Sequence, residues 1–132
     1  MSRAAVYIRT DPSDLPSGED RLPDVEEQAA AVERLAAERG YTVVAHYRDL
    51  EAPGKLLYHK PALKRAIDNV KEHEEWEVLL AADERCFSET ESARHELVHK
   101  FSLYGNRIEC PGKSWPEFEA EMRAYRRKMS GR

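Results

Sequence analysis

The sequence has 132 residues, of which 41% are hydrophobic and 35% charged, and its net charge at neutral pH is −4. A chain of this length forms one ordinary domain around a single core, and this composition excludes a disordered chain. The longest apolar runs have only about five residues, which excludes a membrane span. We therefore expect one cytoplasmic domain over residues 1–132.

Four strand-like runs alternate with four helical patterns along the chain. The predicted strands are rich in β-branched and apolar residues and cover residues 3–9, 41–47, 76–82 and 106–110. The predicted helices carry apolar residues at helical spacing and begin at Pro23-Asp24, Pro61, Ser88 and Ser114. This order predicts an α/β fold with three layers, α/β/α, around a mostly parallel sheet of four or five strands.

In open parallel sheets, ligands bind at the carboxyl ends of the strands. The loops at that edge follow Arg9, Tyr47 and Ala82. We therefore expect any functional site to lie in these three loops.

Two local signals refine the later helices. The pairs Ser88/Glu91 and Ser114/Glu117 have the spacing of capping boxes, in which a hydroxyl and a carboxylate bind free amides of a first helical turn. The helix from Ser88 is expected to bury a stripe made of Ala93, Leu97, Phe101 and Tyr104. The last helix, residues 114–130, has a stripe that packs either on its own sheet or on a second copy of the chain: Phe118, Met122, Tyr125 and Met129.

The basic residues gather at one end of the chain. The last ten residues contain no acidic residue and five basic ones: Arg123, Arg126, Arg127, Lys128 and Arg132. Residues 1–122 therefore carry a net charge of −9. A basic end on an acidic body suits contact with phosphate or with an acidic partner. It equally suits a solvated helix end, because cations stabilise the C-terminus of a helix.

One motif points to metal chemistry. His95-Glu96-Leu97-Val98-His99 fits the HExxH pattern of zinc peptidases, with Glu117, Glu119 or Glu121 as a conceivable third ligand. The two histidines fall opposite the apolar stripe of their helix, toward solvent or a partner rather than a protected cleft. We expect no metal and no cofactor, and a zinc metallopeptidase through His95 and His99 stays as an alternative. Cys86 and Cys110 lack metal-ligand spacing and are expected to be reduced.

An ordered set of short fragments resembles a known family. The fragments are, in chain order, Tyr7-Ile8-Arg9, Asp24-Val25-Glu26-Glu27-Gln28, Glu38-Arg39-Gly40-Tyr41, Asp49, Gly54-Lys55, Lys60-Pro61-Ala62-Leu63, Asp83 and Leu103-Tyr104-Gly105-Asn106-Arg107-Ile108. Over residues 3–110 the set is similar to the N-terminal catalytic domain of the serine recombinases, the resolvase/invertase family. Phe118-Glu119-Ala120-Glu121 also resembles the start of the family's long dimerisation helix. The resemblance implies a homodimer formed through the C-terminal helix.

The family cuts and rejoins DNA through a serine that attacks the scissile phosphate. This chemistry needs a hydroxyl in line with phosphorus and several guanidinium groups to neutralise the developing charge. In the family's Tyr-x-Arg-x-Ser arrangement the nucleophile lies two residues after the arginine, and here Asp11 lies two residues after Arg9. A carboxylate repels phosphate, so the resemblance implies a catalytically inactive relative. Ser13 and Ser17, in a longer loop, are the alternative nucleophiles of an active strand-transferase.

The family's Asp-Arg-x-x-Arg motif is also altered. Here it reads Asp83-Glu84-Arg85-Cys86-Phe87, so both arginine positions are lost and Arg85 falls one place off. Without a nucleophile, we expect Arg9 and Asp83 to form an ion pair between neighbouring strand ends. The candidate DNA contacts are Lys60, Arg123, Arg126, Arg127 and Lys128. The sequence ends at Arg132, before any helix-turn-helix module, so contact with DNA or with a recombinase partner is expected to be weak and made through phosphates.

Overall fold

A computed structural model gives the fold and describes residues 2–12, 21–52, 59–72 and 75–131. Within these residues, strands and helices alternate as the sequence predicts. The elements are β1 (Arg3–Arg9), α1 (Val25–Arg39), β2 (Thr42–Asp49), α2 (Pro61–Glu72), β3 (Val78–Leu80), the 3-10 helix η2 (Glu84–Cys86), α3 (Glu91–Leu103), β4 (Arg107–Glu109) and α4 (Trp115–Met129).

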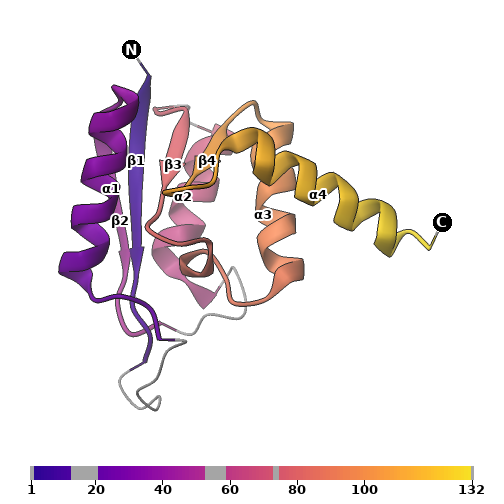
Figure 1. Cartoon of the computed structure of the whole chain (residues 1–132), viewed down its shortest axis with the longest axis horizontal. Helices are drawn as coiled ribbons and strands as arrows, with labels where there is room; N and C mark the ends of the chain where they lie inside the picture. Colours follow the sequence, from indigo (N-terminus) through magenta and orange to yellow (C-terminus); the bar gives the residue numbers. More distant parts are fainter. Residues whose placement is uncertain (1, 13–20, 53–58, 73–74, 132) are drawn as a thin grey trace.

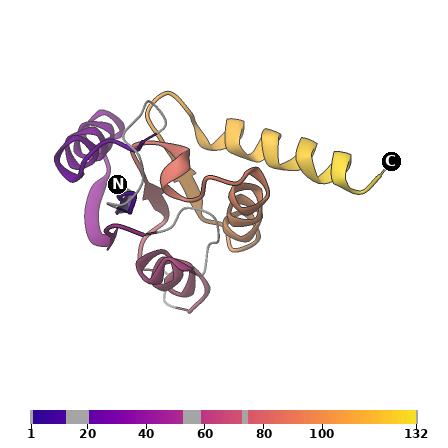
Figure 2. The ribbon, with the colours of Figure 1, turned by 90° about the horizontal axis from the view of Figure 1, so that it is seen from below.

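The strands form one parallel sheet in the order β2-β1-β3-β4. Helix α1 covers one face of this sheet, and α2 and α3 cover the other (Figures 1 and 2). The predicted three-layer α/β fold is thus confirmed, with a sheet of four strands in the described part of the chain. The crossovers from β1 to β2 and from β2 to β3 place β2 and β3 on opposite sides of β1, and the carboxyl ends of these three parallel strands lie at one edge, where the site is predicted.

The core is divided by the sheet into two layers. Side chains alternate along a strand, so neighbouring residues pack on opposite faces. Val6 and Leu80 are buried under α1, whereas Tyr7 and Leu79 are buried on the side of α2 and α3. The continuous apolar character of the sequence near β3 therefore reflects a central strand that is covered on both faces.

Two strands are shorter than predicted. β3 covers Val78–Leu80 rather than residues 76–82, and β4 covers Arg107–Glu109 rather than residues 106–110. β3 ends early because η2 follows it closely, and the Asp83 carboxylate caps η2 by accepting the Arg85 amide at 2.8 Å. β2 is instead longer than predicted and reaches Asp49.

The helix boundaries confirm some of the predicted signals and correct others. Asp24 caps α1 by accepting the Glu27 amide, and Gly40 ends this helix in the left-handed conformation with φ of 72°. At α4, the Glu117 carboxylate accepts the amide of Ser114 at 3.2 Å, which confirms the second capping box. The first capping box is wrong.

Helix α3 begins at Glu91 with Thr90 as its N-cap, not at Ser88. The Ser88 hydroxyl accepts the Thr90 amide at 3.2 Å, so it organises the loop before the helix instead of the first turn. The predicted stripe of α3 is buried at Ala93, Leu97 and Phe101, but Tyr104 is 45% exposed because the helix ends at Leu103.

Helix α4 starts on the domain and then leaves it. Phe118 and Met122 are buried, Tyr125 is half-buried, and Met129 is 64% exposed. Figures 1 and 2 show the outer half of α4 pointing away from the other elements, with the C-terminus beyond its tip. The predicted apolar stripe is therefore covered by the domain only over its first half. No described helix has the length and apolar character needed to cross a bilayer.

Candidate functional site

The predicted site forms where the ends of β1 and β2 meet the loop after β3. Arg9, the last residue of β1, lies opposite Asp49, the last residue of β2, in the parallel pairing. η2 approaches from the third side, because it directly follows β3, the other neighbour of β1. Residues far apart in the sequence thus converge on the Arg9 side chain.

The Arg9 side chain is completely buried and faces the protein's own backbone. Its guanidinium donates to three carbonyl oxygens: Nε to Cys86 at 3.0 Å, Nη1 to Ala52 at 2.9 Å and Nη2 to Arg85 at 2.8 Å. Two of these carbonyls belong to η2 and the third follows β2. Arg9 therefore ties together the three loops that were predicted to form the site.

Asp11 supplies the negative charge for this guanidinium. Its Oδ1 lies 3.2 Å from Nη1 of Arg9, and its Oδ2 accepts the Leu22 amide at 2.8 Å. Asp11 is only 5% exposed. The residue two positions after Arg9 is thus a buried carboxylate that is bound on both oxygens.

The side chain of Gln28, on α1, is hydrogen-bonded to the backbone of Arg9. Its amide nitrogen donates to the Arg9 and Pro23 carbonyls at 2.7 Å each, and its oxygen accepts the Arg9 amide at 3.2 Å. The Cys86 thiol also lies 3.4 Å from this oxygen. Sequence reasoning missed this role, although a glutamine four residues before the buried Val32 falls on the inner face of α1 and was the available signal.

The expected ion pair between Arg9 and Asp83 is wrong. Arg9 pairs with Asp11, and a weaker contact of 3.8 Å joins its Nη2 to Glu89. Asp83 pairs instead with the side chain of Arg85, with its Oδ1 3.2 Å from Nε. Burial opposes ionisation of Asp83, but the hydrogen bonds from Arg85 outweigh it and lower the pKa of this carboxyl. The reason is the turn of η2, which keeps Asp83 and Arg85 on one short segment.

Glu84 and Phe87, at the two altered arginine positions of the Asp83–Phe87 segment, contact other residues of the domain. Phe87 is buried and stacks on Tyr7, with ring centroids 5.9 Å apart. The Glu84 carboxylate binds Arg94 at 3.2 Å and Lys113 at 2.8 Å. No side chain of these two positions adds positive charge beside Arg9.

Lys60 and Asp49 complete the buried charges at this edge. Lys60 is fully buried, and burial together with the nearby Arg9 lowers its pKa to about 8. Asp49 accepts the Tyr7 hydroxyl at 2.8 Å and the amides of Ala62 and Leu63 at 2.8 and 3.0 Å. Asp49 thus caps α2, and burial and the Asp49 carboxylate raise the pKa of Tyr7 so that its hydroxyl stays a donor.

Residues 4–113, which include every side chain of this cluster, match the family model for the resolvase N-terminal domain. The chain belongs to the resolvase family. No curated protein matches its sequence.

Solved structures share the fold of this resolvase-family chain. The N-terminal catalytic domain of TP901-1 integrase is 18% identical, with a TM-score of 0.79 over 98% of this chain and 97% of that one. A resolvase family site-specific recombinase from Streptococcus pneumoniae is 16% identical, with a TM-score of 0.70 over 98% of this chain and 91% of that one. The C-terminal catalytic domain of ISC1926 TnpA, an IS607-like serine recombinase, is 24% identical, with a TM-score of 0.65 over 82% and 69%.

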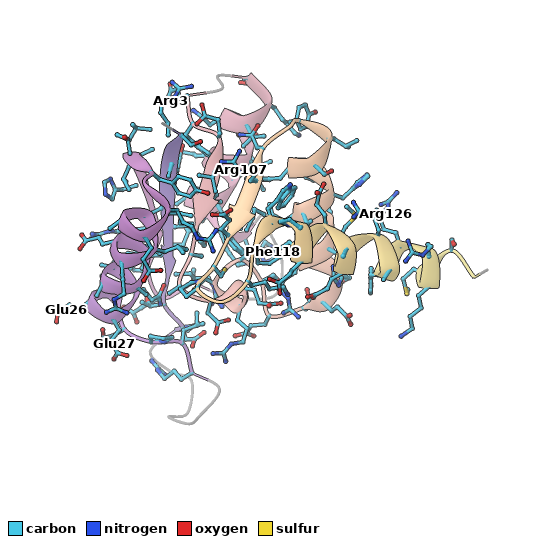
Figure 3. All side chains as sticks on the ribbon, turned by 45° about the horizontal axis from the view of Figure 1, so that its top comes forward. Arg3, Glu26, Glu27, Arg107, Phe118 and Arg126 are labelled. Carbon is cyan, nitrogen blue, oxygen red and sulfur yellow. The ribbon has the colours of Figure 1, made fainter. Side chains whose placement is uncertain are left out.

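The remaining candidates for DNA contact lie on α4 or are buried. Lys60, in the cluster around Arg9, does not face solvent in this conformation. Four basic residues of α4 are exposed: Arg123, Arg126, Arg127 and Lys128. Figure 3 shows Arg126 on the outer part of the helix, well beyond Phe118. Of these, Arg123 makes a long ion pair of 3.9 Å with Glu119. Ser13 and Ser17, the alternative nucleophiles, lie outside the described residues.

The two histidines of the HExxH motif do not converge on a cleft with a further ligand. His95 stacks on Tyr125 of α4, with ring centroids 4.4 Å apart, and its Nε2 lies 3.5 Å from Glu91. Among the residues that the structure describes, no group of three His, Cys, Asp or Glu side chains could hold a metal ion. His95 thus contributes to the contact between α3 and α4.

Proposed function

We propose that this resolvase-family domain has lost the strand-cleaving chemistry of its relatives and works in the cytoplasm as a dimeric, non-catalytic module that associates with DNA or with a recombinase. The observation that carries this proposal is the buried pair of Arg9 and Asp11, with 3.2 Å between Nη1 and Oδ1. The pair supports the loss of activity in two independent ways.

First, the position of the nucleophile is filled by a bound anion. A scissile phosphate is itself an anion, and bringing it beside the buried Asp11 carboxylate is unfavourable at low effective dielectric. Second, the Arg9 guanidinium is occupied. A phosphate would have to displace Asp11 and the backbone carbonyls of Ala52, Arg85 and Cys86, which now accept its hydrogen bonds. Phosphoryl transfer depends on such free, preorganised donors.

Helix α4 supports the second half of the proposal. Its outer half carries the exposed Met129 next to the basic residues Arg126, Arg127 and Lys128. An apolar stripe that the domain leaves uncovered suits a second copy of α4, as the family resemblance implies. The basic side chains beside it suit the phosphates of DNA, in contacts that carry little sequence information.

The proposal is tested by trapping covalent protein–DNA adducts. Supercoiled and nicked DNA are incubated with the purified chain, denatured, and analysed for DNA attached to protein, with an active serine recombinase as the positive control. We expect no adduct. An adduct that disappears in Ser13→Ala or in Ser17→Ala would overturn the proposal and identify the nucleophile of an active strand-transferase.

A further inference from the structure

Lys113 lies between η2, whose carbonyls bind Arg9, and α4, the helix that extends beyond the domain. It sits in the turn from β4 to α4, where its backbone and that of Cys110 exchange two hydrogen bonds of 3.0 and 3.2 Å. The backbone of Lys113 is thereby fixed, and its side chain reaches two different elements.

The Lys113 ammonium binds two carboxylates at the same time. Its Nζ lies 2.8 Å from Oε2 of Glu84, which starts η2, and 2.8 Å from Oε1 of Glu121, on α4. The Phe118 ring lies under the same ammonium, 4.7 Å from Nζ to the centroid. Charge-assisted hydrogen bonds of this length are among the stronger polar contacts of proteins.

The Lys113 ammonium and its arm to Glu84 are more protected than an ordinary surface ion pair. The side chain of Lys113 is 16% exposed and that of Glu84 is 32% exposed, whereas the Glu121 arm on α4 is 53% exposed. Burial by itself would lower the pKa of Lys113, but the hydrogen bonds that its ammonium donates to Glu121 and Glu84 outweigh it and raise the pKa. Lys113 is therefore charged across the neutral range.

Glu84 connects Lys113 to the Arg9 cluster. Its other carboxylate oxygen, Oε1, is held by Arg94 of α3 at 3.2 Å. The residues that follow Glu84 in η2, Arg85 and Cys86, supply two of the three carbonyls that bind the Arg9 guanidinium. A continuous series of contacts thus runs from the end of β1, through η2 and Lys113, to α4.

We propose that Lys113 is a two-armed ionic link that couples the conformation of η2, and with it the Arg9 cluster, to the docking of α4 on the domain. Such a coupling is reciprocal: a change that loosens η2 loosens α4, and a change that undocks α4 loosens η2. If α4 forms the dimer of the proposed function, dimerisation and the state of the site are linked through Lys113. The coupling within one chain does not depend on that function.

Hydrogen exchange measured residue by residue tests the link without DNA and without a dimer. The reporters are the Cys86 and Phe87 amides, which donate to Asp83 and Glu84 within η2, and the α4 amides near Met122. We expect Glu121→Gln, on α4, to speed exchange at the η2 amides roughly threefold or more, and Glu84→Gln to speed exchange on α4 likewise. In a Lys113→Met background, adding either change has no further effect at the distant element.

Two control variants remove ion pairs that do not join these elements. Lys100→Met removes the 3.9 Å contact with Glu96 within α3, and Arg123→Met removes the 3.9 Å contact with Glu119 within α4. Neither is expected to change exchange in η2. Unchanged η2 exchange in Glu121→Gln would overturn the proposal, as would transmission that persists in the Lys113→Met background. If Lys113→Met does not fold, the two single glutamine variants still decide between these outcomes.

Discussion

Arg9 and Asp11, two residues apart at the end of β1, form an ion pair in which the side chains are 0% and 3% exposed. Each partner also binds the backbone: Arg9 donates to three carbonyls and Asp11 accepts the Leu22 amide. Both residues are therefore part of the buried framework of the domain.

Replacing Arg9 by methionine should be strongly destabilising. The variant leaves the Asp11 carboxylate and three carbonyls without their donor in a buried place, and breaking a buried pair in this way costs about 3–5 kcal/mol. The control is Arg85→Met, whose side chain is 36% exposed and pairs with its neighbour Asp83, with an expected loss below about 1 kcal/mol. Urea unfolding of both variants measures the difference, and equal losses would contradict the structural role of Arg9.

Restoring the hydroxyl at position 11 should not restore cleavage. Asp11→Ser supplies a nucleophile of the family's type, but the Arg9 guanidinium stays bound to the carbonyls of Ala52, Arg85 and Cys86. The variant also loses the anion of a buried ion pair and should be less stable than the wild type. We expect no covalent adduct with nicked DNA, and adduct formation by Asp11→Ser would show that one substitution is enough to rebuild the site.

The buried Lys60 should give the domain a distinct pH dependence. Its pKa falls from 10.5 in the unfolded chain to about 8 in the folded one, so between these values the unfolded state binds more protons and stability rises with pH. The stability of the wild type relative to Lys60→Met should therefore rise by about 3 kcal/mol between pH 8 and pH 10.5. Chemical unfolding across this range measures it. The control is Lys64→Met, an exposed lysine on α2, the helix that begins directly after Lys60, and a trend of equal size there would exclude Lys60 as the cause.

The outer half of α4 should mediate self-association. Met129→Glu places a charge on the uncovered part of the apolar stripe, so it should convert a dimer to a monomer in sedimentation equilibrium at high micromolar concentration. Leu103→Glu changes a comparably exposed residue at the end of α3 and should leave the mass unchanged. A monomeric wild type under these conditions would refute the dimer of the proposed function.

DNA binding, if it uses α4, should be electrostatic. Neutralising Arg126, Arg127 and Lys128 together by glutamine should weaken binding and reduce the slope of log K against log salt by up to about 3, since each phosphate contact contributes about 0.9. The control replaces three exposed basic residues of α2, Lys64, Arg65 and Lys71, in the same way. Equal losses in both variants would mean that binding follows net charge and not the position of α4.

Much of the fold could be predicted because its signals are local. The spacing of apolar residues identified all four helices, and Gly40 and the Ser114/Glu117 pair marked boundaries that the structure confirms. The prediction of a helix start failed where the same residues could form either a capping box or a loop. Ser88 and Glu91 have capping-box spacing, but burial of Ser88 and its bond to Thr90 favour a loop before the helix.

The candidate site was harder to predict because its partners come from different loops. The sequence pointed to Arg9 and Asp11 as neighbours in an unusual arrangement, but it could not show that backbone carbonyls of η2 and of Ala52 saturate the guanidinium. Asp83 was paired with the wrong arginine for the same reason, since the short turn of η2 brings Arg85 back to it. Lys113 carried no motif at all, and only the packing of α4 beside η2 gives it two partners.

The buried ion pair between Arg9 and Asp11 also constrains which substitutions this sequence can accept during evolution. A neutral residue at either position leaves the other as a lone buried charge, so each single step lowers stability. A joint exchange for two neutral residues avoids that lone charge and should cost less than the two single steps added together, because the positions are coupled. The two positions are thus expected to covary among close homologues. A lineage that once adopted this pair has a barrier to returning to an arginine that faces a substrate.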